Sequence, residues 1–147
     1  MLLQLSLATL MVVGIAAIHV LGLAILTRLL RSHSRLFPRL RVRLLTILLA
    51  ATVGIIAIHT VEIWAYAAVY LEVGAFANFE EALYYSTVTY ASIGYGDVLM
   101  PHAWRIFGAI EGAAGIIMLG WSTAYLVSLL TQLKLIGHDW LAVEKRG

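Results

Sequence analysis

Cysteine is absent from this chain of 147 residues, proline occurs twice, and charged residues are scarce. Without cysteine the chain can form no disulfide, no thiolate metal site and no thiol nucleophile. Charged residues make up 12% of the sequence, against about 25% in soluble domains. Hydrophobic residues make up 62%, and the mean hydropathy is +0.93. We therefore predict a membrane protein with room for one domain. The net charge of +2 gives no reason to expect a nucleic-acid partner.

Three long apolar stretches, at about 2–30, 44–71 and 104–133, make up most of the chain. Each is longer than the roughly 20 apolar residues that an α-helix needs to cross a bilayer. We therefore predict an all-α membrane protein with three transmembrane helices.

An arginine-rich segment separates the first two stretches and defines the expected topology. Its six arginines are Arg28, Arg31, Arg35, Arg39, Arg41 and Arg43. Such loops mark the cytoplasmic side, where they contact anionic headgroups. A voltage sensor is the alternative, because the first three arginines recur at helical spacing, but they lie beyond the apolar stretch and Pro38 interrupts the helix. We expect a multi-pass cell (inner) membrane protein with its N-terminus outside and its C-terminus in the cytoplasm.

A shorter helix is predicted at 79–91, between the second and third apolar stretches. Asn78 can cap its first turn, and Glu81 can reach back to the N–H of the capping residue. Because this helix is too short to span a bilayer, we predict a re-entrant segment that is buried in protein.

The short helix runs into the string Thr-Tyr-Ala-Ser-Ile-Gly-Tyr-Gly-Asp at 89–97. The string resembles the potassium-channel filter signature Thr-x-x-Thr-x-Gly-Tyr-Gly-Asp, with Ser92 in place of the second threonine. Residues 44–133 together resemble the two-helix pore module of the potassium channel superfamily. The chain is similar to small bacterial ion-channel proteins that carry one extra N-terminal span. A Gly-rich surface turn is the alternative, but the preceding helix and the two flanking apolar stretches argue against it.

The resemblance implies a potassium-selective channel that forms a homotetramer, since each chain supplies one filter strand. It divides the chain into an N-terminal helix with the arginine loop (1–43), the pore module (44–133) and a short cytoplasmic tail (134–147). Bound K⁺ ions are the expected ligands, and no other cofactor is expected.

The same resemblance assigns the residues that would bind K⁺. The ligands would be the Ser92 hydroxyl and backbone carbonyls within the filter Ser92, Ile93, Gly94, Tyr95 and Gly96, with the K⁺ sites at the first four of these. Glycine at 94 and 96 suits this role, because aligned carbonyls require a positive φ at alternate residues.

Further residues would support the filter or allow the third span to bend. By the resemblance, the filter support would come from Asp97, Tyr84, Tyr85 and Thr89. Val88 stands where some relatives have a glutamate, so that carboxylate pair with Asp97 is not expected. In the third span, Gly115 and then Gly112 are hinge candidates, and close helix packing is the equal alternative.

Two acidic residues lie inside the apolar stretches, where an ionisable group is costly and indicates a functional site. Glu62 shares a helix face with His59 at i, i+3, and Glu111 lies at a similar depth in the third span. We expect a buried polar layer in which either glutamate accepts from Thr87, Thr89 or a tyrosine of the short helix. Protonation of this layer would alter gating, and a packing role alone is the alternative.

Other functions fit the sequence less well. A weakly selective cation channel is disfavoured by the tyrosine between the two glycines, and a transporter with four filter repeats would need a longer chain. A non-conducting membrane adaptor with a filter-like loop stays open. We expect no enzyme, because no Ser/His/Asp set or cofactor loop occurs and the five histidines are dispersed. A repeated string, Val13-Gly-Ile-Ala-Ala-Ile-His19 and Val53-Gly-Ile-Ile-Ala-Ile-His59, is assigned no function.

Overall fold

Helices make up almost all of the computed structural model, which describes residues 1–33 and 40–133. They are α1 (Leu2–His33), α2 (Leu40–Glu72), α3 (Phe79–Tyr90), the short 3₁₀ helix η1 (His102–Trp104) and α4 (Arg105–Gln132). No strand occurs in the described residues, so the all-α prediction is confirmed. Arg35, Arg39 and the predicted tail at 134–147 lie outside them.

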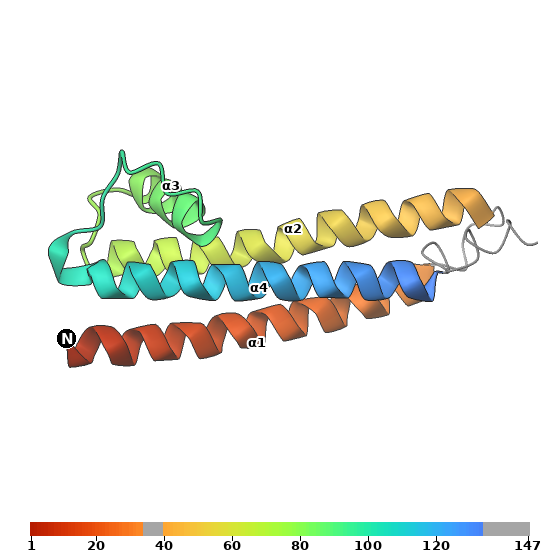
Figure 1. The fold of residues 1–147 in the computed structure, drawn as a ribbon, viewed down its shortest axis with the longest axis horizontal. Coiled ribbons are helices and arrows are strands. Elements are labelled where there is room, and N and C mark those ends of the chain that lie inside the picture. The colour runs from red at the N-terminus through yellow and green to blue at the C-terminus, as the bar shows by residue number, and fades with distance from the viewer. Residues whose placement is uncertain (34–39, 134–147) are drawn as a thin grey trace, which may run out of the picture.

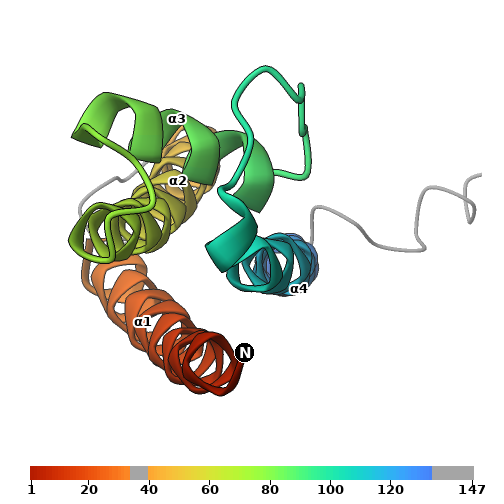
Figure 2. The same ribbon diagram turned by 90° about the vertical axis from the view of Figure 1, so that its left-hand side faces the viewer.

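The three long helices lie side by side, and α3 lies on the side of α2 and α4 opposite α1 (Figures 1 and 2). α1 packs on both α2 and α4, and α3 packs between the same two helices. The N-terminus lies at the same end of the bundle as the loop that joins α3 to α4 (Figure 1). The C-terminal ends of α1 and α4 lie at the opposite end, together with the start of α2.

Each long helix is long and apolar enough to cross a membrane. The candidate spans are Leu2–Ser32, Leu44–Glu72 and His102–Gln132. They coincide with the three stretches predicted from the sequence. Large apolar side chains lie on their outer surfaces, including Val53, Ile56 and Ile117, as expected for faces turned toward lipid or another chain.

α1 and α2 approach each other closely through small residues. A Cβ atom at Gly22 of α1 would lie 2.7 Å from the Ile58 side chain of α2, and one at Gly54 of α2 would lie 2.5 Å from Leu26 of α1. Each glycine therefore receives a branched side chain from the other helix, which is how small residues bring membrane helices together.

The start of α3 confirms Asn78 as the capping residue. Asn78 has an extended backbone, with φ −145°, and its side-chain oxygen accepts from the Glu81 N–H at 2.9 Å. The buried face of α3 consists of Ala82, Ser86, Val88 and Tyr90. A cluster of aromatic rings packs beside it between α2 and α4, with Tyr70 at 5.3 Å from Phe107 and 5.5 Å from Tyr85, measured between ring centroids.

The position of the N-terminus generates a test of orientation. We expect single cysteines at Leu2 and Ala77 to react with an impermeant thiol reagent added outside cells, and a cysteine at Ser32 not to react. The natural absence of cysteine leaves no background labelling. Reaction at position 32 alone would reverse the orientation expected from the arginine-rich segment.

Candidate functional site

The loop after α3 has the backbone that the motif requires. Gly94 and Gly96 have φ values of 56° and 78°, as expected, and Ser92 also has a positive φ, of 57°. Positive φ is uncommon for a residue with a side chain, and it was expected only at the two glycines. Ile93 and Tyr95 are 50% and 72% exposed in the single chain. The motif thus forms an irregular, exposed loop with its glycines in the left-handed region.

The first residues of the loop fold back over the C-terminal end of α3. The Val88 carbonyl accepts from Ile93 N–H at 2.8 Å and from Gly94 N–H at 3.1 Å, and Ser92 N–H donates to the Thr89 carbonyl at 2.9 Å. These bonds satisfy carbonyls that the helix leaves unpaired at its end. The position of the loop is therefore determined by the last turn of α3.

Asp97 ties the far end of the loop to α3. The Tyr84 hydroxyl donates to Asp97 Oδ2 at 2.6 Å, and Val98 N–H donates to Oδ1 at 3.1 Å. Because the Tyr84 hydroxyl stabilises the carboxylate, it lowers the pKa of Asp97, and the same bond raises the pKa of Tyr84. Asp97 is thus hydrogen-bonded to Tyr84. The apolar side chain of Val88 cannot form a carboxylate pair with Asp97.

Tyr85 and Thr89 contact α4. The Tyr85 ring lies 5.1 Å from Phe76, and the Tyr85 hydroxyl lies against Gly108 of α4. The carbonyl and methyl of Thr89 lie beside Gly112 of α4. The predicted supporting residues therefore divide into Tyr84, which contacts the loop, and two that fix α3 on its neighbours.

Glu111 is fully buried between three helices. It accepts from the Ser86 hydroxyl of α3 at 2.5 Å and from the Tyr70 hydroxyl of α2. Ser86 also lies 3.0 Å from the Ile63 carbonyl. A buried carboxylate requires such donors, because an unpaired one is costly in an apolar interior. Glu111 thus connects α4 to α2 and to the middle of α3.

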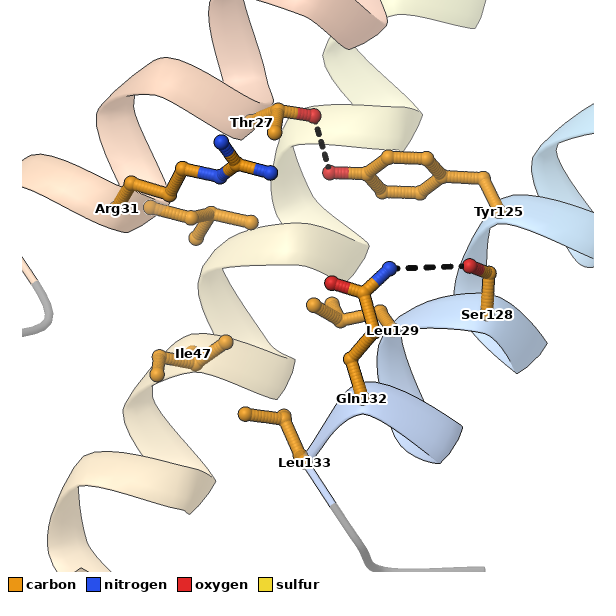
Figure 3. A pocket seen from close by; sticks show the side chains of 9 residues that line it. Thr27, Arg31, Ile47, Tyr125, Ser128, Leu129, Gln132 and Leu133 are labelled. Atoms are coloured by element: carbon orange, nitrogen blue, oxygen red, sulfur yellow. Dashed lines mark hydrogen bonds between the residues drawn. The ribbon is translucent and has the colours of Figure 1, made fainter.

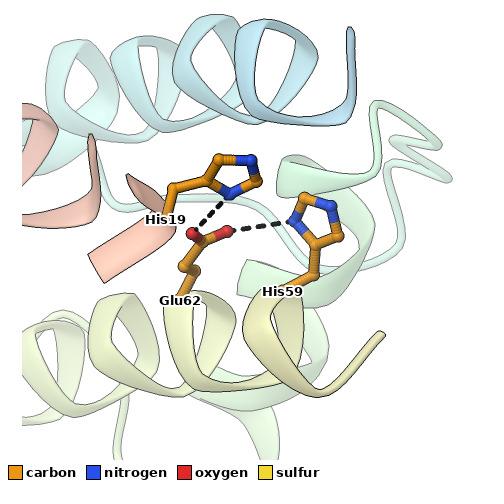
Figure 4. A group of neighbouring side chains, drawn as sticks. All are labelled: His19, His59 and Glu62. Carbon is orange, nitrogen blue, oxygen red and sulfur yellow. Dashed lines mark hydrogen bonds and ion pairs between the residues drawn. The ribbon is translucent and has the colours of Figure 1, made fainter. Parts of the chain in front are cut away.

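Glu62 lies at the centre of a second network, which joins the four α-helices of the described residues. Figure 4 shows its contacts with His19 and His59. His19 Nδ1 of α1 lies 2.9 Å from Glu62 Oε1, and His59 Nδ1 lies 3.0 Å from Oε2. The Tyr90 hydroxyl of α3 donates to Oε2 at 2.5 Å. Ser122 Oγ of α4 lies 3.0 Å from His59 Nε2 and 3.4 Å from His19 Nε2. All five side chains are buried. We call these five residues the Glu62 network.

The two carboxylates meet partners that differ in part from the expected ones. The expected contact of Glu62 with His59 and with a tyrosine of the short helix is present. The Thr87 hydroxyl instead donates to the Leu83 carbonyl, and Glu111 receives its bond from Ser86. No function was expected of His19, yet it contacts Glu62. The repeated string contained the signal, since it ends in a histidine in each of two helices.

His19, His59 and Glu62 also form a set of donors that a metal ion accepts, with ligand atoms within 4.8 Å of one another. Two ligands of a tetrahedral zinc site lie about 3.3 Å apart, because each metal bond is roughly 2.0–2.1 Å long. The N···O distances of 2.9 and 3.0 Å are those of direct hydrogen bonds. The arrangement is therefore described as a hydrogen-bond network.

Gly115 is a point of close contact between α4 and the end of α3. A Cβ atom there would collide with the backbone carbonyl of Tyr90. At Gly112 a Cβ would make ordinary contacts with the carbonyl and methyl of Thr89, at 3.5 and 3.7 Å. The close contact with Tyr90 favours a packing role for Gly115. A hinge in α4 at Gly115 or Gly112 stays a prediction.

Comparison with known proteins gave one match. A family model described as "Ion channel" matches residues 42–132, which include nearly all of α2, then α3, the loop and α4, and exclude α1. No curated protein and no solved structure matches the chain.

The contact at Gly115 generates a stability prediction. We expect Gly115→Ala to lower the free energy of unfolding by about 1–3 kcal/mol, because a backbone carbonyl cannot rotate away from the new methyl group. Gly120→Ala in the same helix is the control, since nothing lies within 4 Å of its Cβ position. Thermal unfolding in detergent compares the two, and equal midpoints would contradict the close contact.

The Tyr84 bond generates a pH prediction. Removing the hydroxyl in Tyr84→Phe withdraws a donor that favours the Asp97 carboxylate, so the pKa of Asp97 should rise toward its ordinary value. The stabilisation from this bond is present above the ordinary pKa and is lost as the pH falls through the lowered one. The variant has no hydroxyl to donate, so it should lack this pH-dependent stabilisation. Carboxyl NMR titration measures the shift, with Tyr85→Phe as the control that should leave Asp97 unchanged.

Proposed function

Starting from the fact that this chain belongs to the ion channel family, we propose that it conducts K⁺ selectively through a pore formed by four copies. The family membership and the three candidate spans establish that the chain is a multi-pass membrane protein with ion channel activity. The choice of ion, the number of chains and the orientation belong to the proposal.

The observation that carries potassium selectivity is the backbone of the loop. Two glycines at positive φ flank Tyr95, directly after the end of a short helix. Potassium filters replace the hydration shell of the ion with rings of backbone carbonyls, and this conformation is the one that turns successive carbonyls in one direction. The carbonyls of Ser92, Ile93, Gly94 and Tyr95, with the Ser92 hydroxyl, are the proposed ligands.

The exposure of the loop supports assembly. In one chain the loop leaves Ile93 and Tyr95 largely uncovered, although its other side is anchored on α3. One strand of carbonyls surrounds an ion on one side only, so further copies must complete the coordination shell. Four copies of the 16.1 kDa chain around one axis would do so.

The end of α3 also favours a cation. The C-terminal end of a helix carries partial negative charge, and it is directed toward the loop here. Asn78 and the two glutamates at the start of α3 complement the opposite end. We propose that α3 is a re-entrant pore helix, whose dipole stabilises a cation that is losing water.

The opposite end of the bundle suits the cytoplasmic face. A cavity of about 250 Å³ lies there between α1, α2 and α4, and Arg31, Tyr125, Ser128 and Gln132 line it (Figure 3). Tyr125 contacts Thr27 at 3.0 Å, and Gln132 donates to Ser128 at 3.2 Å. We propose that this end contacts anionic headgroups, which an arginine among hydroxyl and amide groups can hold.

Selectivity is tested by Gly94→Ala. An alanine at φ 56° is strained, and it should distort the loop, so the K⁺/Na⁺ permeability ratio should fall to near one in reconstituted bilayers. Gly74→Ala is the matched control, because Gly74 has φ 66°, lies in the turn after α2 and has nothing within 4 Å of its Cβ position.

Both variants should keep the native mass of four chains, which separates a filter defect from a failure to assemble. A wild-type K⁺/Na⁺ permeability ratio in Gly94→Ala would contradict the assignment of this loop as the filter. Conduction by a monomer or a dimer would contradict the proposed four-chain pore.

A further inference from the structure

We propose that His19 of α1 is a positioning residue for the conducting loop, acting through Glu62 and Tyr90. α1 lies outside the matched residues 42–132, yet His19 is fully buried among side chains of the pore module. The role in conduction rests on the proposed function, whereas the mechanical link rests on the contacts alone.

The two oxygens of Glu62 have different partners. Oε2 receives the Tyr90 hydroxyl and lies beside His59, whereas Oε1 is contacted by His19. In the described part of the chain, no other hydrogen bond to Oε1 occurs. Loss of His19 would therefore leave one oxygen of a fully buried carboxylate unpaired, and such a group is expensive to keep in place. We expect Glu62 to reorient toward other donors when His19 is removed.

A reorientation of Glu62 would be felt at Tyr90. The Tyr90 hydroxyl is held by Glu62, its ring lies 5.7 Å from the His59 ring, and its backbone carbonyl lies against Gly115 of α4. Tyr90 is the last residue of α3, two positions before Ser92. The bonds from Ile93 and Gly94 to the Val88 carbonyl begin in the same helical turn. A shift of Tyr90 thus acts directly on the start of the loop.

The geometry also identifies the nitrogen of His19 that matters. Nδ1 faces the carboxylate at 2.9 Å, and Nε2 faces Ser122 at 3.4 Å. An asparagine places an amide N–H close to the position of Nδ1, whereas glutamine reaches to the position of Nε2. His19→Asn should therefore preserve the bond to Glu62, and His19→Gln should lose it although it is equally polar.

The test compares four variants in assembled protein in detergent and in bilayers. They are His19→Leu, His19→Asn, His19→Gln and Ile15→Ala. Ile15 is the matched control, because it lies one turn before His19 on α1, is 1% exposed and takes no part in the Glu62 network. Hydrogen exchange of the amides of Ile93 and Gly94 reports the position of the loop, and K⁺/Na⁺ permeability ratios report its function.

We expect the Ile93 and Gly94 amides of His19→Leu and His19→Gln to lose about tenfold or more in protection against exchange. A tenfold change corresponds to the free-energy cost of leaving one buried acceptor unpaired. His19→Asn and Ile15→Ala should stay within about twofold of the wild type. The permeability ratio should fall with the protection. If His19→Leu does not assemble, the contrast between asparagine and glutamine decides by the same criterion.

Three results would overturn the role of His19. They are wild-type protection in the leucine and glutamine variants, equal loss in the asparagine and glutamine variants, and equal loss in Ile15→Ala, which would mean that α1 acts by packing alone. The proposed function fails separately. A wild-type protein without K⁺ selectivity would refute that function, while loop protection that depends on His19 would still establish the mechanical link.

Discussion

The structure depends on the requirement that two carboxylates buried in apolar helices be hydrogen-bonded, because an unpaired one is far more costly there than in water. Glu62 of α2 and Glu111 of α4 receive donors from α3, Tyr90 and Ser86 respectively. These two residues of α3 are four positions apart and share one face. Polar bonds therefore determine the height and rotation of α3, and apolar packing fills the space around it.

The two sides of the loop are stabilised differently. The side toward α3 is complete within one chain, through the carbonyl of Val88 and the bond between Tyr84 and Asp97. The Tyr95 side chain, in contrast, is exposed in the single chain. Support behind the loop is thus local, whereas the surface proposed to hold the ion is one that several copies would share. A substitution behind the loop can therefore alter its backbone without touching the surface that is proposed to face other copies.

Much of the fold could be predicted, because long apolar runs, an asparagine cap and a glycine pattern are local signals. The same reasoning found Glu62, His59 and Glu111, since a polar group within an apolar span is conspicuous. It did not find His19, Ser86 or Ser122 as their partners, because those contacts depend on how helices distant in sequence are rotated against each other. The positive φ of Ser92 was missed for a related reason. The hydrogen bonds that fold the loop back onto α3 impose this φ. Serine has no conformational preference from which a positive φ could be predicted.

The described residues contain three long helices, and this odd number has a consequence for how such chains could be joined. α1 begins at the end of the bundle that carries the loop, and α4 ends at the opposite end (Figure 1). A direct genetic fusion of two copies, head to tail, would make the second copy enter the membrane upside down relative to the first. A pore module of two helices has both ends on one side and can be duplicated in tandem. With α1 in place, a concatenated version would need one more crossing segment between copies.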